Sequence, residues 1–132
     1  MDVRTLFPTE YIASHDLAGK DVNLTISRVV VEDLRTTEGS ERKPIVYFEE
    51  MEERNRKDRN QPNKKLVLNK TNAKVIAGLL GYETDDWGGK RITLFATTCQ
   101  AFGETVDCIR IRDKAPPAKR SAKTDERQQA IA

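Results

Sequence analysis

Hydrophobic and polar residues alternate in several short stretches of the chain, and each alternation predicts a strand. The first is residues 22–26, where every second side chain is apolar. The next apolar positions include Val29 and Val31, so the alternation slips by one residue. Because strand side chains change faces at every residue, the slip predicts a β-bulge or bend near residues 27–28. Burial of residues 29–31 on both faces is the alternative explanation.

The other apolar runs predict four more strands and one helix. The strands are expected at residues 44–49, 65–69, 90–95 and 105–112. Apolar residues spaced three and four apart predict a helix that Asn69 or Thr71 caps and Gly81 ends. Residues 36–43 and 50–64 contain few apolar side chains. We therefore predict two polar loops there, the second of them long and mobile.

The order of these elements predicts a mainly β protein. Three strands, a helix and a hairpin between Lys20 and Arg112 are the layout of a five-stranded Greek-key barrel of the oligonucleotide-binding (OB) type, with one helix between strands three and four. The exposed strand face and loops of this fold often hold oligonucleotides. We expect residues 1–112, including an N-terminal lead-in, to form this domain. Residues 113–132 have the composition of a disordered basic tail.

Size and composition limit the class of protein. A chain of 132 residues and 15.0 kDa fits one domain with a modest core. No apolar run approaches the roughly 18 residues of a membrane-spanning helix. The N-terminus lacks the apolar region of a secretion signal, and two cysteines are too few for a disulfide framework. We therefore expect a cytoplasmic protein that does not enter a membrane.

The net charge of +2 is unevenly distributed. Residues 113–132 contain five basic and three acidic side chains, which accounts for the whole net charge. Within the neutral remainder, residues 32–53 hold eight acidic and three basic side chains, and residues 54–65 hold six basic and one acidic. A neutral domain argues against coating duplex DNA by bulk charge, but it leaves room for a local basic groove.

Candidate catalytic groups are few, so we predict no enzyme activity, cofactor or metal. The single histidine, His15, sits in no recognisable motif, and Cys99 and Cys108 lack the spacing of a zinc site. Residues 88–90 resemble a phosphate loop only superficially, because the full GxxxxGK[ST] pattern is missing. Residues 84–86 are better explained as a turn than as a cation site.

One face of the predicted sheet gathers basic and aromatic side chains. If Ile92 and Leu94 point into the core, alternation places their neighbours on the opposite, outer face. Applied to all the strands, this reasoning gives an outer set of Tyr47, Lys65, Arg91, Phe95, Arg110 and Arg112. Single-strand binders use such a set, because cations follow the phosphates while rings stack on bases. The alternative is that the rings pack under loops and the arginines form a solvated surface.

Three further residues belong to the candidate site, and the aromatic residue that the second strand contributes has to be chosen from two. On the second strand either Tyr47 or Phe48 reaches the outer face, and Tyr47 is preferred because its hydroxyl tolerates water. Arg56 and Lys57 belong to the basic segment beside that face. Trp87 lies between the helix and the fourth strand, where it is either a stacking surface or, more commonly for a lone tryptophan, a plug that closes the end of the barrel.

Three motifs resemble those of a family of small phage and prophage proteins. They are Leu17-x-Gly19-Lys20-Asp21-Val22, Leu66-Val67-Leu68-Asn69-Lys70-Thr71-Asn72-Ala73, and Asp85-Asp86-Trp87-x-Gly89-Lys90-Arg91-Ile92-Thr93-Leu94. The resemblance covers about residues 3–112. It implies an OB-like fold and binding of single-stranded DNA in phage replication or recombination. The segment 49–64 is longer than the family pattern, and the C-terminus lacks the acidic, hydrophobic tip of bacterial single-strand binders.

From these observations we predict a non-enzymatic protein that binds single-stranded nucleic acid, DNA before RNA, in the cytoplasm of a host cell. The alternative is an interaction module that docks on a phage or host replication protein, since complementary charged patches steer partners. A homodimer formed through an open strand edge is also left open.

Overall fold

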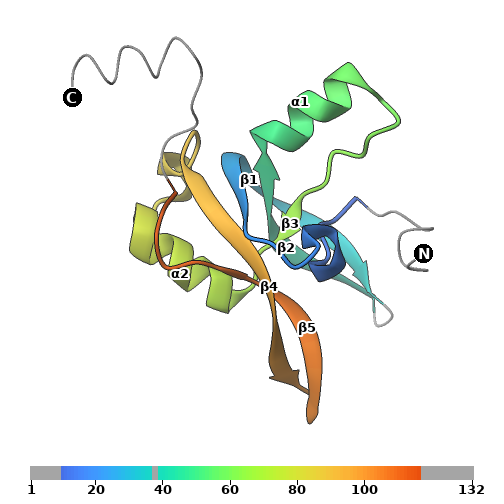
Figure 1. Ribbon diagram of the computed structural model, residues 1–132, viewed down its shortest axis with the longest axis vertical. Helices are drawn as coiled ribbons and strands as arrows, with labels where there is room; N and C mark the ends of the chain where they lie inside the picture. Colours follow the sequence, from blue (N-terminus) through green and yellow to red (C-terminus); the bar gives the residue numbers. More distant parts are fainter. Residues whose placement is uncertain (1–9, 37–38, 117–132) are drawn as a thin grey trace.

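The computed structural model describes residues 10–36 and 39–116, which form one five-stranded antiparallel sheet with two α-helices (Figure 1). The strands are β1 (Val22–Thr36), β2 (Gly39–Phe48), β3 (Leu66–Val67), β4 (Arg91–Ala101) and β5 (Glu104–Ile111). The helices are α1 (Glu49–Lys57), α2 (Lys70–Leu80) and the short 3-10 helices η2 (Ser14–Leu17) and η3 (Thr84–Asp86). The strand order is β3-β2-β1-β4-β5, so β1 is central. The mainly β class predicted from the sequence is confirmed.

The central strand β1 changes partner at the predicted bulge. Residues 22–25 pair with β4, whereas the strand from Ile26 onward pairs with β2. The register against β2 shifts between Ile26 and Arg28, where the alternation of apolar residues slips. An extra residue bends a strand and increases its twist. β1 therefore serves both halves of the sheet, and the bulge predicted near residues 27–28 is confirmed.

The hairpin of β1 and β2 is longer than the apolar pattern indicates. Residues 39–43, predicted as part of a loop, pair with β1 up to the Glu32–Lys43 partners. The side chains of residues 39–42 are exposed. This end of the hairpin extends beyond the core, so its strands need no apolar residue. The predicted loop over residues 36–43 is wrong for this reason.

Helix α1 occupies the first half of the segment predicted as a mobile loop. None of its residues is fully buried; Met51 packs against the edge of the core, and polar contacts join the helix to β1. The Glu50 carboxylate accepts hydrogen bonds of 2.7 Å from both the backbone N–H and the hydroxyl of Thr25. Arg28 donates to Glu52. The helix has acidic residues in its first turn and basic residues in its last, which complements the helix dipole.

The core lies between the inner face of the sheet and the segments that cover it. Its fully buried members include Ile26, Phe48, Ile76, Ile92 and Leu94. The α2 face predicted from the apolar spacing supplies Ile76, and Asn69 caps this helix by accepting from the Asn72 N–H at 2.8 Å. Burial of these aliphatic and aromatic side chains is the main source of stability. The inward positions predicted on β1, β3 and β4 are occupied as expected.

The sheet is open between β3 and β5 in the described part of the chain. β3 has two residues and pairs with β2, and the five strands join in one sheet. Two other segments lie beside this opening. Tyr11 forms a parallel bridge with Lys65, and the Asn72 side-chain amide of α2 donates to the Ile109 carbonyl of β5 at 3.0 Å. The structure thus shows an open five-stranded sheet with a second helix, α1, that the sequence analysis did not predict.

The buried amide of Asn72 leads to a testable prediction. Asn72 is 1% exposed and supplies the hydrogen bond to the Ile109 carbonyl. Asn72→Ala leaves this carbonyl without its donor and should lower the free energy of unfolding by about 1–3 kcal/mol. Urea unfolding followed by circular dichroism measures the change. Asn72→Asp, which places an acceptor against an acceptor, should be at least as destabilising. Wild-type stability in both variants would contradict this role.

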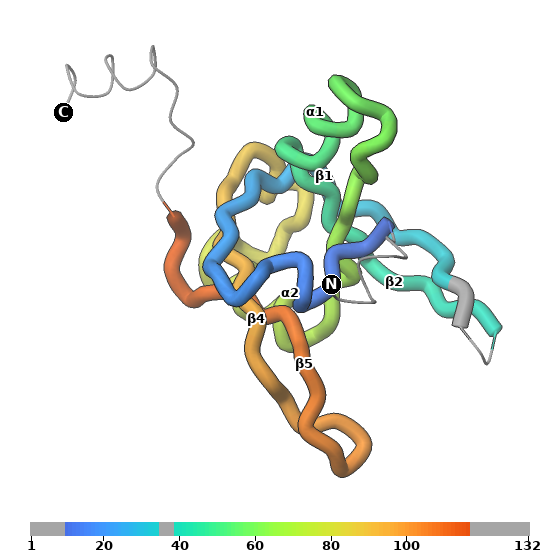
Figure 2. Tube along the Cα trace, turned by 45° about the vertical axis from the view of Figure 1, so that its right-hand side comes forward, coloured from blue at the N-terminus to red at the C-terminus, as the bar shows by residue number. Residues whose placement is uncertain are grey.

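Two hairpins extend from the body of the molecule (Figures 1 and 2). The β4–β5 hairpin projects away from α1, which lies at the other end of the sheet in both views. Among the described residues, no helix is both long enough and apolar enough to cross a membrane. Most of the tail predicted at residues 113–132 lies outside the described residues.

Candidate nucleic-acid interface

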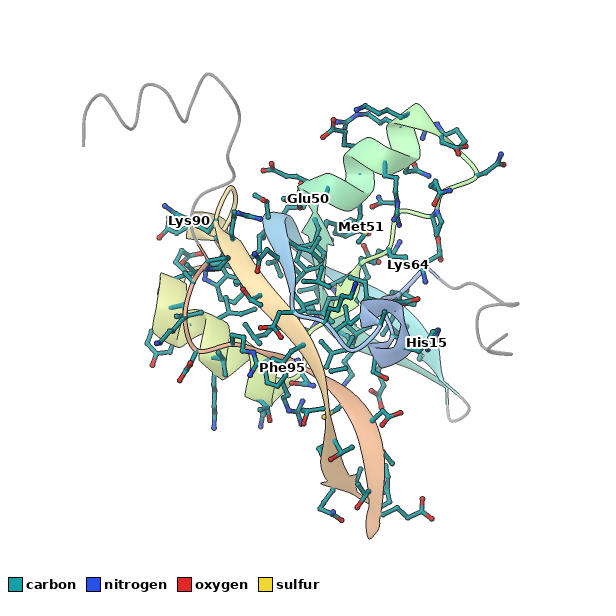
Figure 3. The ribbon with its side chains drawn as sticks, in the orientation of Figure 1. His15, Glu50, Met51, Lys64, Lys90 and Phe95 are labelled. Atoms are coloured by element: carbon teal, nitrogen blue, oxygen red, sulfur yellow. The ribbon has the colours of Figure 1, made fainter. Side chains whose placement is uncertain are left out.

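Three residues on the outer side of β4 and β5 form what we call the platform: Phe95, Arg110 and Arg112. Arg91, which strand alternation also places on the outer face, pairs with Thr25 of β1, the residue that Glu50 of α1 contacts, so it lies toward α1 and is not part of the platform. Phe95 and Arg110 are direct cross-strand partners, so their side chains share one face. The Arg112 guanidinium lies 3.6 Å from the centre of the Phe95 ring. Phe95 is half-buried and lies on the sheet well away from Glu50 and α1 (Figure 3). The platform thus combines an aromatic ring, one side of which Arg112 covers, with two cations on the face that alternation predicts.

Neighbouring polar residues hold the platform in place. Arg112 makes two hydrogen bonds to the Asp21 carboxylate, of 3.0 and 3.2 Å, and its backbone N–H donates to the Thr93 carbonyl at 2.9 Å. Thr93 in turn donates to the Asn23 side chain at 2.6 Å. A two-point contact fixes the plane of a guanidinium. Arg112 is thus ordered over Phe95, while Asp21 offsets part of its charge.

A second group of charges surrounds Tyr47 on β2. Its ring is flanked by the Arg28 guanidinium at 4.0 Å and the Lys65 ammonium at 5.3 Å, both measured to the ring centre. Its hydroxyl donates to Glu32. Tyr47 does not belong to the core cluster that contains Val46 and Phe48, so it faces the outer side. However, only 8% of the residue is exposed.

The cover over Tyr47 limits what this residue can do. A base cannot lie flat on a ring that is already covered by Arg28 and Lys65. Lys65 itself is half-buried, with its ammonium 3.8 Å from Glu10 and 5.6 Å from the Tyr11 ring centre. In this conformation Tyr47 supports two cations and does not present a stacking surface, so we leave it out of the platform.

The environment of Tyr47 predicts a loss of stability in alkali. Burial, followed by the hydrogen bond to Glu32 and its charge, raises the pKa of Tyr47 to about 12. The folded state then retains a proton that the unfolded state loses near pH 10. The contribution of Tyr47 to the free energy of unfolding is therefore fully present below pH 10 and is lost as the pH rises toward 12. Urea midpoints measured from pH 8 to 12 should fall in the wild type. Tyr47→Phe should show a smaller fall, and equal pH dependence in both proteins would refute this explanation.

Arg56 and Lys57 lie on α1, separate from the platform. This helix packs against β1 and β2, whereas the platform lies on β4 and β5. Lys57 forms an ion pair of 3.1 Å with Glu53 one turn earlier. Burial alone would raise the pKa of Glu52, but hydrogen bonds from Ser27 and Arg28 and the charges of Arg28 and Arg56 together lower it. The basic end of α1 is therefore partly neutralised within its own helix.

Trp87 is a plug in the core. It is 2% exposed, packs with the core cluster and donates from its indole nitrogen to the Gly81 carbonyl at 2.9 Å. Its burial agrees with the packing role expected for a lone tryptophan and not with a stacking surface. The indole joins the end of α2 to the segment before β4.

The sequence analysis did not single out Phe102, at the tip of the β4–β5 hairpin. Its side chain is fully exposed, and it occupies the left-handed region with φ of 54°. The signal in the sequence is the pair Phe102-Gly103 between two alternating runs, which is the position of a two-residue hairpin turn.

The remaining polar candidates form no evident catalytic site. His15 lies in η2 beside Asp16, at 3.7 Å, and Lys64 donates to the same carboxylate at 2.9 Å (Figure 3). Burial and a hydrogen bond with Cys99 raise the pKa of the Cys108 thiol, which disfavours the reactive thiolate. Within residues 10–36 and 39–116, no group of three or more metal-ligating side chains is found.

Comparison with protein-family models, with curated proteins and with solved structures gave no match to this chain. The resemblance to small phage proteins, and everything it implies, therefore stays a prediction.

Proposed function

We propose that this protein binds single-stranded nucleic acid, DNA before RNA, through the platform on β4 and β5. The observation that carries the proposal is the half-buried Phe95, whose ring is covered on one side by the Arg112 guanidinium and whose cross-strand partner is Arg110. The Arg112 side chain is 47% exposed, so a base can stack on the guanidinium plane that lies on the ring. A base stacked on an aromatic ring contributes roughly 1–3 kcal/mol, and neighbouring arginines hold the phosphates. No covalent step is part of the proposal.

The arrangement of strands supports the same proposal. β1 is central, bends at its bulge and joins the β1–β2 half to the β4–β5 half. This arrangement is compatible with a partly open OB barrel, in which nucleic acid lies across the strand face between two loops. The motifs that resemble phage proteins suggest replication or recombination as the setting.

The alternative function, docking on a replication protein, is weakened by the ion pairs that the structure shows. It rests on the acidic segment 32–53 and the basic segment 54–65, and many of these charges pair with near neighbours. Ion pairs join Arg28 to Glu52, Lys57 to Glu53 at 3.1 Å and Lys43 to Glu41 at 3.3 Å. Charges paired within the domain contribute less to attracting a partner.

Fluorescence anisotropy with labelled oligonucleotides tests the proposal. We would titrate oligo-dT of about 15 nucleotides, oligo-rU of equal length and a matched duplex at several salt concentrations; single-strand binders occupy about 4–16 nucleotides per OB domain. We expect the single strands to bind and the duplex to bind far more weakly. If both platform arginines contact phosphates, log affinity should fall with log salt at a slope of about −1.4. Absence of binding at low salt, or equal binding of the duplex, would refute the proposal.

A further inference from the structure

The tip of the β4–β5 hairpin carries a ring that the turn itself does not require. Phe102 and Gly103 form the two-residue loop between the paired Ala101 and Glu104. Both have positive φ, 54° and 77°, as a type I′ turn demands. Asn-Gly is the favoured pair for this turn, and a bulky residue with positive φ is strained. Phe102 is therefore held in an unfavourable conformation with its ring fully in solvent.

The charge of this hairpin favours a protein rather than a nucleic acid as the partner of the ring. From Ala96 to Ile109 the two strands and their turn contain no lysine or arginine and two acidic residues, Glu104 and Asp107. Both acidic side chains are exposed. Phosphates would be repelled by such an arm, whereas aromatic rings are typical anchors of protein interfaces.

A pocket of suitable size lies beside the opening between β3 and β5. Its volume is about 340 Å³, and its apolar walls include Ile12, Leu66, Val67 and Ile109. An apolar cavity of roughly 150 Å³ is enough to hold a benzene ring. The pocket borders Asn69, the residue that caps α2. The volume is therefore sufficient for a phenyl ring, which would contact the apolar part of a wall that Ser14, Asn72 and Asp107 also line.

The surroundings of the pocket carry charges of both signs: Asp107 lines it on the β5 side, and the N-terminus of α2 borders it through Asn69. The α2 side is the one that suits the acidic hairpin tip. α2 begins at Lys70, whose side chain is exposed, and its first turn contains no acidic residue. The N-terminus of a helix carries a partial positive charge and favours a nearby anion. Glu104 follows Phe102 by two residues. A hairpin tip that entered the pocket would thus bring a carboxylate to the positive end of α2.

We propose that two copies of this chain associate head to tail, with Phe102 of one copy in the pocket between β3 and β5 of the next, and Glu104 beside Lys70. The tip and the pocket are different surfaces of one molecule, so the contact is heterologous and each copy keeps a free tip or a free pocket. Copies aligned in this way along a single strand would bind it cooperatively. The contact itself needs no nucleic acid.

Sedimentation velocity without nucleic acid tests the proposal. A small interface gives weak binding, and we expect a dissociation constant of roughly 10 µM to 1 mM. The sedimentation coefficient of the wild type should rise with concentration across that range. Phe102→Asn suits the turn better, so it should remain folded and stay monomeric. Tyr82→Asn, which removes another fully exposed ring away from the tip, is the matched control and should associate like the wild type.

Charge variants test the rim of the pocket. Lys70→Glu places an acidic residue in the first turn of α2, which favours the helix, but it should repel Glu104 and abolish association. Glu104→Lys should do the same. The double variant with both changes restores opposite charges and should associate again.

Mixing two defective proteins tests the head-to-tail geometry. Phe102→Asn keeps an intact pocket, and Lys70→Glu keeps an intact tip. Each alone should be monomeric, whereas their equimolar mixture should form a dimer that grows no further. A monomeric wild type up to about 1 mM, association that survives Phe102→Asn, or a mixture that stays monomeric would each overturn the proposal. If Phe102→Asn self-associates like the wild type but binds oligo-dT more weakly, the ring would instead be assigned to nucleic acid.

Discussion

The double variant Phe95→Ala, Arg110→Gln should bind oligo-dT at least about 30-fold more weakly than the wild type. The lost stacking and the lost charged hydrogen bond together correspond to roughly 2–5 kcal/mol. Both side chains lie on the outer side of the hairpin and are not part of the fully buried core. The fold should therefore persist, which thermal unfolding checks. Unchanged affinity in this double variant would show that nucleic acid does not bind at the platform.

The two single variants should differ in their response to salt. Arg110→Gln removes a phosphate contact, so it should make the slope of log affinity against log salt shallower by about 0.7. Phe95→Ala removes an uncharged contact, so it should weaken binding at every salt concentration without changing the slope. Lys74→Gln, which removes an exposed cation from α2, is the control for net charge and should leave affinity near that of the wild type.

The largest loss of stability is expected for Trp87→Ala. Truncating a buried tryptophan costs about 3–5 kcal/mol, a large part of the 5–15 kcal/mol that holds an ordinary domain together. The variant also leaves the Gly81 carbonyl without its indole donor. Urea unfolding followed by circular dichroism measures the effect. A loss below about 1 kcal/mol would contradict the assignment of Trp87 as a core plug.

Trp87→Phe separates the plug from a stacking role. Phenylalanine retains much of the packing but not the hydrogen bond, so this variant should lose less stability than Trp87→Ala. Because the indole is buried away from the platform, Trp87→Phe should bind oligo-dT as the wild type does. A marked loss of oligo-dT binding in a folded Trp87→Phe protein would show that Trp87 contributes to nucleic-acid binding.

The elements that the sequence predicts well are those with apolar periodicity. The slip between Ile26 and Val29 locates the bulge, and the spacing of three and four locates α2 with its cap at Asn69. Helix α1 has no such pattern, because it docks through Glu50 and Glu52 rather than through an apolar face. The acidic first turn and basic last turn of α1 are the signals that would have indicated it.

The candidate site was partly predictable for a similar reason. Strand alternation correctly places Phe95 and Arg110 on one face, because β4 and β5 pair in regular register. The cover over Tyr47 comes from Arg28 and Lys65, which lie far apart from each other in the sequence. Whether the barrel closes depends on how far β3 extends, and an apolar run of three residues does not specify its two paired positions.

The change of partner along β1 has a consequence for the order of folding. Its later residues pair with β2 through a short turn, whereas Val22 pairs with Leu94, far away in the sequence. Contacts between distant residues require closure of a large loop and form slowly. During synthesis on a ribosome, the β1–β2 hairpin can form early, but the first residues of β1 must wait until β4 has emerged. We therefore expect an intermediate in which residues 22–25 of the central strand lack their partner.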